Sequence, residues 1–304
     1  MREVFGQALV DLAEKFPRMV VLDADVSTST KTLMFANKYP QRFFNVGVAE
    51  ANMADIAGGM STCGLRPVVS TFAIFISLKT TEQVRSTICY NNLSVVLAGG
   101  YAGVSDSFDG ASHQSLTDIA VLRAMPGLTV VVPGDPTEVS QALEQALERP
   151  GPTYIRLSRN PSPVLFENAE PLETGKIRTI KTGSDVTITV CGIPTFIAIE
   201  AAGKLEQLGI SVDLLEVSTI KPIDAETLMK SVSKTGKIIT VEEHSIYGGL
   251  GSAVAEAIGK RCPAKMDMIG IGDTFAETGS YMDLLSEYGI SSENIVNRAK
   301  AILG

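Results

Sequence analysis

Residues 94–114 read SVVLAGGYAGVSDSFDGASHQ, a short apolar run followed by a long, polar loop that is rich in glycine. The run 94–98 is typical of a buried strand. In open α/β sheets, ligands bind at the carboxyl ends of the strands. A long loop without internal structure at such a place favours a functional role for 99–114, which contains His113. A surface loop without a role is the alternative.

Strand-like and helical runs alternate on both sides of this stretch. The strand-like runs are rich in β-branched residues and cover 19–23, 66–70, 94–98, 128–132 and 153–157. Helical spacing covers 49–62, 72–90, 117–123 and 136–147. This alternation predicts a parallel sheet with helices on both faces.

The alternation breaks at 158–182, which contains Pro161, Pro163, Pro171 and Gly175 and has no period. We expect a first domain over 1–160, a linker over 161–182 and a smaller α/β domain over 183–304. The strands expected in the second domain are 186–190, 212–217, 237–241 and 266–271, and the helices are 194–208, 225–231 and 251–259.

Composition narrows the class of protein. The chain has 304 residues, 45% of them apolar, and a formal net charge of −8, which argues against nucleic acid or an anionic membrane as the main partner. Two histidines are too few for a His-rich metal site, and four widely spaced cysteines are typical of free thiols in the cytoplasm. Neither a signal peptide nor a transmembrane span is expected.

Other predicted strand ends carry side chains with two interpretations each. Asp23 to Lys31 contains two carboxylates and then hydroxyls, which suit either an anion site or an ordinary helix cap. Glu50 begins a run of small apolar residues, where a carboxylate gains from the helix dipole or, if buried, needs a partner. Phe72 and Phe75 suit either the core or a shelf for a flat heterocycle.

In their order along the chain, these segments resemble transketolase, specifically the C-terminal half found in split, two-gene forms. The resemblance covers nearly the whole chain. The matching segments are Ala24-Asp25 with Ser29, Gly47 to Glu50, Ser70 to Phe72 with Phe75, Asp109 to Gln114, Arg156 to Arg159, Ile220 to Asp224, Glu242 to His244 and Gly248 to Gly251.

The resemblance implies a pyrimidine-binding domain for thiamin diphosphate, followed by a transketolase C-terminal domain. Glu50 matches the catalytic glutamate that hydrogen-bonds the aminopyrimidine ring of the cofactor and so helps its reactive carbon to lose a proton. Phe72 and Phe75 match the aromatic residues that stack on that ring, and Asp25 matches a residue near the cofactor. The implied activity is transfer of a two-carbon ketol unit from a ketose to an aldose, as in pentose phosphate metabolism.

Substrate recognition is implied in the same way. Asp109 and His113 match residues that contact the sugar hydroxyls and the reacting centre, and Ser29 and Arg159 match groups that hold the terminal phosphate of the sugar. The family has His where Tyr101 stands. Tyrosine supplies no cation and Asp106 adds negative charge, so a sugar without phosphate, or with another terminal anion, fits as well.

The sequence contains no Gly-Asp-Gly, the start of the family's signature for binding the diphosphate through Mg²⁺. The resemblance therefore implies an N-terminal partner subunit that supplies the Mg²⁺ ligands, and an α2β2 assembly in which this chain also self-associates. No metal ligand is expected here, and His244 is expected to be structural.

Three alternatives remain open on the sequence. The beta subunit of a 2-oxo acid dehydrogenase shares the domain order and the cofactor, but Asp-Gly-Ala-Ser-His-Gln and Leu-Ser-Arg favour transketolase. Deoxyxylulose-phosphate synthase is also related, but its single chain includes the diphosphate-binding domain. A non-catalytic regulatory subunit would leave the retained site residues unexplained.

Overall fold

The first sheet is built from short, apolar strands that run parallel. Its order is β10-β5-β6-β4-β3-β1-β2. The parallel strands are β1 (Met19–Asp23), β2 (Phe43–Asn45), β3 (Arg66–Phe72), β4 (Val96–Gly100), β5 (Thr129–Val131) and β6 (Thr153–Arg156). The computed structural model describes all 304 residues, and it confirms the five strands predicted in this half. The three-residue strand β2 was not predicted.

Helices cover both faces of this sheet, as predicted. One face carries α1 (Arg2–Leu12), α3 (Leu33–Lys38) and α6 (Pro136–Glu148), and the other carries α4 (Glu50–Thr62) and α5 (Asp118–Arg123). The short helices α2 (Ser27–Thr30) and η1 (Pro40–Arg42) precede β2. Strand β1 is buried on both sides: Met19 and Val21 pack with α1, whereas Val20 and Leu22 pack with α4. Burial on both faces explains its unbroken apolar sequence.

The predicted helix over 72–90 is wound more widely than an α-helix. Two segments have π-helical hydrogen bonding, η2 (Phe75–Lys79) and η3 (Gln83–Cys89). Two side-chain hydroxyls in this region donate hydrogen bonds to main-chain carbonyls four residues earlier, Ser77 to Ala73 at 2.7 Å and Thr80 to Ile76 at 2.6 Å. Such bonds compete with regular helical pairing, and π-helical turns are frequent at functional sites.

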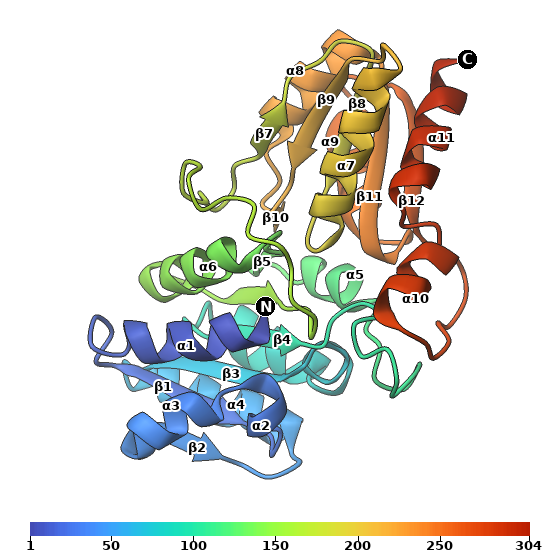
Figure 1. The fold of residues 1–304 in the computed structure, drawn as a ribbon. Helices are drawn as coiled ribbons and strands as arrows, with labels where there is room; N and C mark the ends of the chain where they lie inside the picture. Colours follow the sequence, from blue (N-terminus) through green and yellow to red (C-terminus); the bar gives the residue numbers. More distant parts are fainter.

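The second domain is a five-stranded sheet stacked beyond the β5 side of the first domain (Figure 1), in the order β12-β11-β8-β9-β7. Its parallel strands are β8 (Val186–Val190), β9 (Val212–Glu216), β11 (Lys237–Ser245) and β12 (Lys265–Ile271). The helices are α7 (Pro194–Gln207), α8 (Ala225–Thr235), α9 (Leu250–Ile258), α10 (Tyr281–Glu287) and α11 (Ser292–Leu303). No helix of the chain is both long and apolar enough to cross a bilayer.

Two short strands join the domains more closely than the sequence suggests. Strand β7 (Arg178–Lys181) falls in the expected linker 161–182 but pairs antiparallel with β9, so this interval is not all connector. Strand β10 (Thr219–Lys221) follows β9 in the chain but pairs antiparallel with β5 of the first sheet. One buried apolar cluster accordingly contains residues from both domains.

Asp135 anchors the start of the interdomain connection. Its side chain is fully buried; Oδ1 accepts a hydrogen bond from the Glu138 N–H (2.9 Å) at the start of α6. Oδ2 accepts from the N–H groups of Leu165 at 2.8 Å and Phe166 at 2.9 Å. The residue therefore caps a helix and also fixes the chain that leaves the first domain.

We expect Asp135→Ala to lower the free energy of unfolding by about 3 kcal/mol, because it removes a helix cap and leaves two further N–H groups without their acceptor. Ser291→Ala is the matched control, since Ser291 caps α11 through one N–H alone, and its expected cost is about 1 kcal/mol. Urea unfolding measures both losses. Equal losses would contradict the anchoring role of Asp135.

Candidate active site at the carboxyl edge of the first sheet

The site begins where the parallel strands of the first sheet end. Because β1, β2, β3, β4 and β6 run in one direction, the segments that follow them lie along the same edge of the sheet. Every predicted site residue belongs to one of these segments or to the helix that follows: Asp25, Ser29, Glu50, Phe72, Phe75, Tyr101, Asp109, His113 and Arg159.

An aromatic cluster occupies the middle of this edge. The rings of Phe72 and Phe75 are nearly parallel, 16° apart in plane, with centroids separated by 5.6 Å. Tyr101 stacks against Phe72 at 4.2 Å, and His113 meets Phe72 and Phe75 edge-on at 6.0 and 5.5 Å. Phe72 and Tyr101 are buried, whereas Phe75 and His113 are half-buried. The cluster therefore presents a partly open aromatic surface.

Glu50 lies beside this surface as the first residue of α4 and is only 5% exposed. Its Oε1 accepts a hydrogen bond from Lys79 Nζ at 3.0 Å, and the same ammonium lies 4.2 Å from the centroid of the Phe75 ring. Lys79 was not predicted, because an exposed lysine in a helical run carries no signal. Its side chain is about half exposed.

A second part of the site contains two arginines near the ring of Tyr101. The guanidinium carbons of Arg2 and Arg159 lie 5.3 and 5.2 Å from the centre of its ring. Arg2 Nη1 donates to the Tyr101 hydroxyl and, at 3.0 Å, to the Ser29 carbonyl. Arg2 was not predicted. This contact places a cation beside Tyr101, the position at which the resemblance implies a histidine.

Asp106 lies under Arg159 in the loop that follows β4. Its carboxylate is fully buried, and Arg159 Nη1 donates to Oδ1 at 3.0 Å. Burial, together with the neighbouring Asp109 carboxyl, raises the pKa of Asp106 to about 6, although Arg159 acts in the opposite direction. Asp109 itself is exposed. Burial and Asp109 therefore oppose the ionisation of Asp106, and the ion pair with Arg159 favours it.

The segment after β1 serves a structural purpose. Asp23 is buried and accepts hydrogen bonds from the hydroxyls of Thr30 and Thr32, both at 2.8 Å, and burial raises the pKa of its carboxyl. These two hydroxyls point inward and are not available to an outside anion. Asp25 is exposed and accepts from Asn45 Nδ2 at 2.8 Å, outside the aromatic cluster.

The loop after β4 packs against the second domain, which contributes a hydrogen-bond acceptor to it. The N–H of Val104 donates to Glu243 Oε1 at 2.8 Å, and the Tyr281 hydroxyl donates to Glu243 Oε2 at 2.8 Å. Gly103 has a φ of +65° and no room for a side chain, since a Cβ would lie 2.2 Å from Glu243 Oε1. Burial raises the pKa of Glu243 to about 7.

An ion pair inside the first domain completes this junction. Arg156 donates from Nε to Asp118 Oδ2 at 2.8 Å and from Nη2 to the Glu243 carbonyl at 2.9 Å. Burial would raise the pKa of Asp118, but the Arg156 guanidinium outweighs it and holds the pKa below its usual value. His244 is also fully buried, between the Ser245 carbonyl and the Ala120 N–H, and burial lowers its pKa to about 4. Both contacts of His244 are with main-chain groups, as expected of a structural residue.

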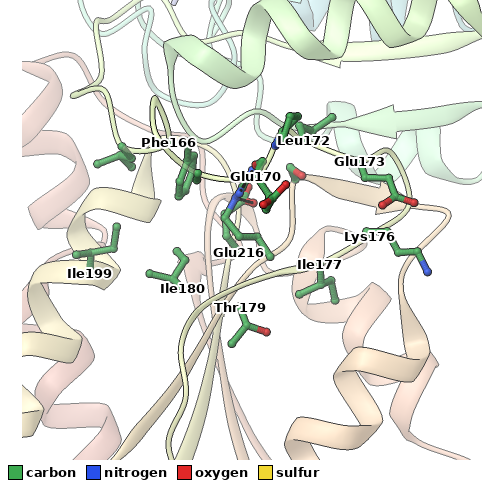
Figure 2. A pocket seen from close by; sticks show the side chains of 15 residues that line it. Phe166, Glu170, Leu172, Glu173, Lys176, Ile177, Thr179, Ile180, Ile199 and Glu216 are labelled. Carbon is green, nitrogen blue, oxygen red and sulfur yellow. Dashed lines mark hydrogen bonds and ion pairs between the residues drawn. The ribbon is translucent and has the colours of Figure 1, made fainter.

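A separate cavity of about 560 Å³ lies at the domain connection, lined by residues from 165–180 together with Ile199, Glu216 and Ser218 (Figure 2). Arg178 is one of the lining residues and donates a hydrogen bond to Glu138 Oε1 at 3.1 Å. Burial and the nearby Glu138 carboxyl raise the pKa of Glu216 well above its usual value. None of the predicted site residues lines this cavity, so it is distinct from the aromatic cluster.

Comparison with known proteins places this architecture in one family. Residues 1–163 match the transketolase pyrimidine-binding domain, and residues 175–295 match the transketolase C-terminal domain. The chain belongs to the transketolase family, whose members depend on thiamin diphosphate. Within the family it corresponds to the C-terminal section that some organisms encode as a separate chain.

Two relatives and one solved structure support this placement. A putative transketolase C-terminal section of Methanocaldococcus jannaschii is 40% identical over 98% of this chain and 94% of its own length. A 6-deoxy-6-sulfo-D-fructose transketolase subunit of Clostridium sp. is 35% identical over 99% of this chain and 94% of its own. The solved structure, described as a split-gene transketolase in an inactive beta4 tetramer, is 42% identical, covers 99% of this chain and 97% of its own, and superposes with a TM-score of 0.90.

We expect Glu243→Gln to change how stability depends on pH. The folded-state pKa of Glu243, about 7, lies above the ordinary value of 4.5. Ionisation of this carboxyl therefore lowers the free energy of unfolding. The loss grows as the pH rises from 4.5 to 7 and is constant above pH 7. The variant lacks this loss. Its unfolding free energy relative to wild type should therefore rise between pH 5 and 8, by on the order of 3 kcal/mol.

Denaturant unfolding at pH 5, 6, 7 and 8 measures this difference. Glu256→Gln is the control, because Glu256 is exposed and pairs with Arg123 at the surface. A stability difference between the Glu243→Gln variant and wild type that is the same at all four pH values would contradict the burial argument.

Proposed function

We propose that this chain is the C-terminal subunit of a split transketolase and transfers a two-carbon ketol unit from a ketose to an aldose with thiamin diphosphate. The observation that carries the proposal is the meeting of Glu50, the Phe72–Phe75 pair and His113 at one sheet edge. A regulatory subunit that had lost catalysis would have no need to keep this arrangement. When bound, the cofactor supplies the nucleophilic carbon that accepts the ketol unit.

The residues of the aromatic surface fit the pyrimidine ring of that cofactor. Phe75 offers a partly accessible face next to Phe72, which is suited to stacking a flat heterocycle. Glu50 lies at the end of this surface and is shielded from water, so it can hold a proton at a ring nitrogen once Lys79 turns away. We assign Asp25, on the neighbouring segment, to the rim of the cofactor site.

Substrate binding is assigned to the loop after β4 and to the two arginines. His113 is oriented by its neighbour, because Ser112 Oγ lies 2.9 Å from its Nδ1 and Nε2 is left to face the substrate. Asp109 is exposed on the same loop and is suited to accept hydrogen bonds from sugar hydroxyls. Ser29, Arg2, Tyr101 and Arg159 form the end of the site that receives the far end of the sugar.

A partner subunit would supply the diphosphate-binding domain and the Mg²⁺ ligands, in an α2β2 assembly. Large apolar side chains exposed near the site support a contact with another chain: Val48 is 73% exposed, Phe108 is 70% exposed and Phe275 is 83% exposed. Contiguous apolar surface is typical of interfaces, and a partner chain could cover these side chains. The solved relative is described as an inactive tetramer of beta chains, which agrees with the need for a second kind of subunit.

Reconstitution tests the proposal directly. This chain, with and without the N-terminal subunit, is assayed for ketol transfer from xylulose 5-phosphate and from unphosphorylated xylulose to ribose 5-phosphate and to ribose, with thiamin diphosphate and Mg²⁺. We expect activity only in the mixture. A mixture that binds the cofactor and transfers no ketol unit from either donor would contradict the proposal, and decarboxylation of a 2-oxo acid would support the dehydrogenase alternative.

We expect Glu50→Gln to lower kcat in the mixture by at least a hundredfold, because an amide cannot exchange a proton with the cofactor ring. The fold should be retained, as shown by circular dichroism. Glu82→Gln, an exposed change in the same region, is the control and should leave kcat unchanged. Equal turnover of the Glu50→Gln variant and wild type would exclude the proposed role of Glu50.

We expect His113→Ala to lower kcat/KM by about a hundredfold, in the range of general acid–base catalysis, while cofactor affinity changes by less than threefold. The reason is that His113 meets the rings of Phe72 and Phe75 at a steep angle and does not stack on them, so the contact assigned to the cofactor ring is with the phenylalanines. Steady-state kinetics and a cofactor titration separate the two effects. Loss of cofactor binding, with normal turnover at saturating cofactor, would contradict the assignment of this loop to the substrate.

A further inference from the structure

Arg159, one of the two arginines at the far end of the site, already has an anionic partner. Asp106 accepts from its Nη1 at 3.0 Å, and the side chain of Asp106 is fully buried, whereas that of Arg159 is about one-third exposed. The second oxygen of Asp106 has no hydrogen-bond partner. Arg159 is thus the only cation in direct contact with this carboxylate. Because Asp106 is fully buried, water does not screen the ion pair on the side of the carboxylate.

The main chain holds the two residues against each other. The Ser105 hydroxyl accepts from the Arg159 N–H at 3.1 Å, and Asn160 Nδ2 donates to the Ser105 carbonyl at 3.2 Å. Arg159 is therefore fixed beside Asp106 by its own backbone and by its neighbour. A substrate anion that approaches Arg159 also approaches the buried carboxylate behind it.

The cations at this end of the site have carboxylate partners. Tyr101 supplies no cation, and its hydroxyl accepts a hydrogen bond from Arg2. Arg2 Nε lies 3.4 Å from the exposed carboxylate of Glu3, a surface contact that water weakens. Lys31 Nζ lies 3.7 Å from the same Glu3 carboxylate. Asp106 offsets the charge of Arg159, so this guanidinium offers a substrate less positive charge than an unpaired arginine would, which suits a hydroxyl or one negative charge better than the two of a phosphate monoester near neutral pH.

We propose that Asp106 is a specificity-determining residue that selects sugars whose far end carries at most one negative charge, a hydroxyl or a monoanion, over sugars that end in a phosphate dianion. This inference rests on the proposed ketol transfer and specifies its substrate class. Asp106 acts through Arg159, by offsetting its charge, and makes no contact with the reacting atoms.

The test compares matched donors in the reconstituted complex with thiamin diphosphate and Mg²⁺ at pH 7.5. The readout is the ratio of kcat/KM for xylulose 5-phosphate to kcat/KM for unphosphorylated xylulose. We expect Asp106→Asn to raise this ratio at least tenfold, mainly through a lower KM for the phosphate. Asp267→Asn is the control, because it also removes the carboxylate partner of an arginine, Arg298, but in the second domain and at the surface, and it should leave the ratio unchanged.

A direct binding measurement makes the inference independent of turnover. Calorimetry on the same complex gives the dissociation constants of ribose 5-phosphate and ribose, and Asp106→Asn should strengthen binding of the phosphate alone by at least tenfold. Asp106→Ser replaces the Asp106→Asn variant if the latter does not fold. Absence of ketol transfer from either donor would overturn the proposed function, while the binding ratio would still decide the role of Asp106.

Two results would overturn the selectivity inference. One is a wild-type complex that prefers the phosphorylated donor more than a hundredfold. The other is a ratio that Asp106→Asn leaves unchanged, since the buried carboxylate would then have no influence on the charge that the site accepts.

Discussion

The Arg156–Asp118 ion pair lies where the two domains meet, and both side chains are almost completely shielded from water. A buried guanidinium is unfavourable unless all its donors are satisfied. Here it is held by a carboxylate of the first domain and by main-chain carbonyls of Ser115 and Glu243. The pair thereby fixes α5, the end of the loop after β4 and strand β11 relative to one another. Removing either partner of such a pair typically costs about 3–5 kcal/mol.

This constraint explains why the second domain matters to a site that it does not line. The loop after β4 carries Tyr101, Asp106, Asp109 and His113, and it receives much of its support from Glu243. The other residues of the site lie on segments that follow the parallel strands, and these segments lie along one edge of the sheet. The resulting site combines an aromatic surface and a shielded carboxylate at one end with two arginines at the other.

Much of this could be predicted from the sequence, because unbroken apolar strands and helical spacing are local signals. The five strands of the first half and four of the second were identified in this way. Contacts between distant segments carry no such signal: Arg2 reaches Tyr101 across 99 positions of sequence. Strands β7 and β10 have only four and three residues, including charged ones, and they become strands only because β9 and β5 offer them an edge.

The position of β10 has a consequence for how the chain is made. During synthesis on the ribosome, β5 emerges well before the segment that pairs with its free edge. Until then the nascent first domain exposes unpaired main-chain groups, which is the condition under which chains aggregate or exchange strands. Closure of this edge therefore waits until the chain has been translated through β8, α7 and β9 of the second domain to β10.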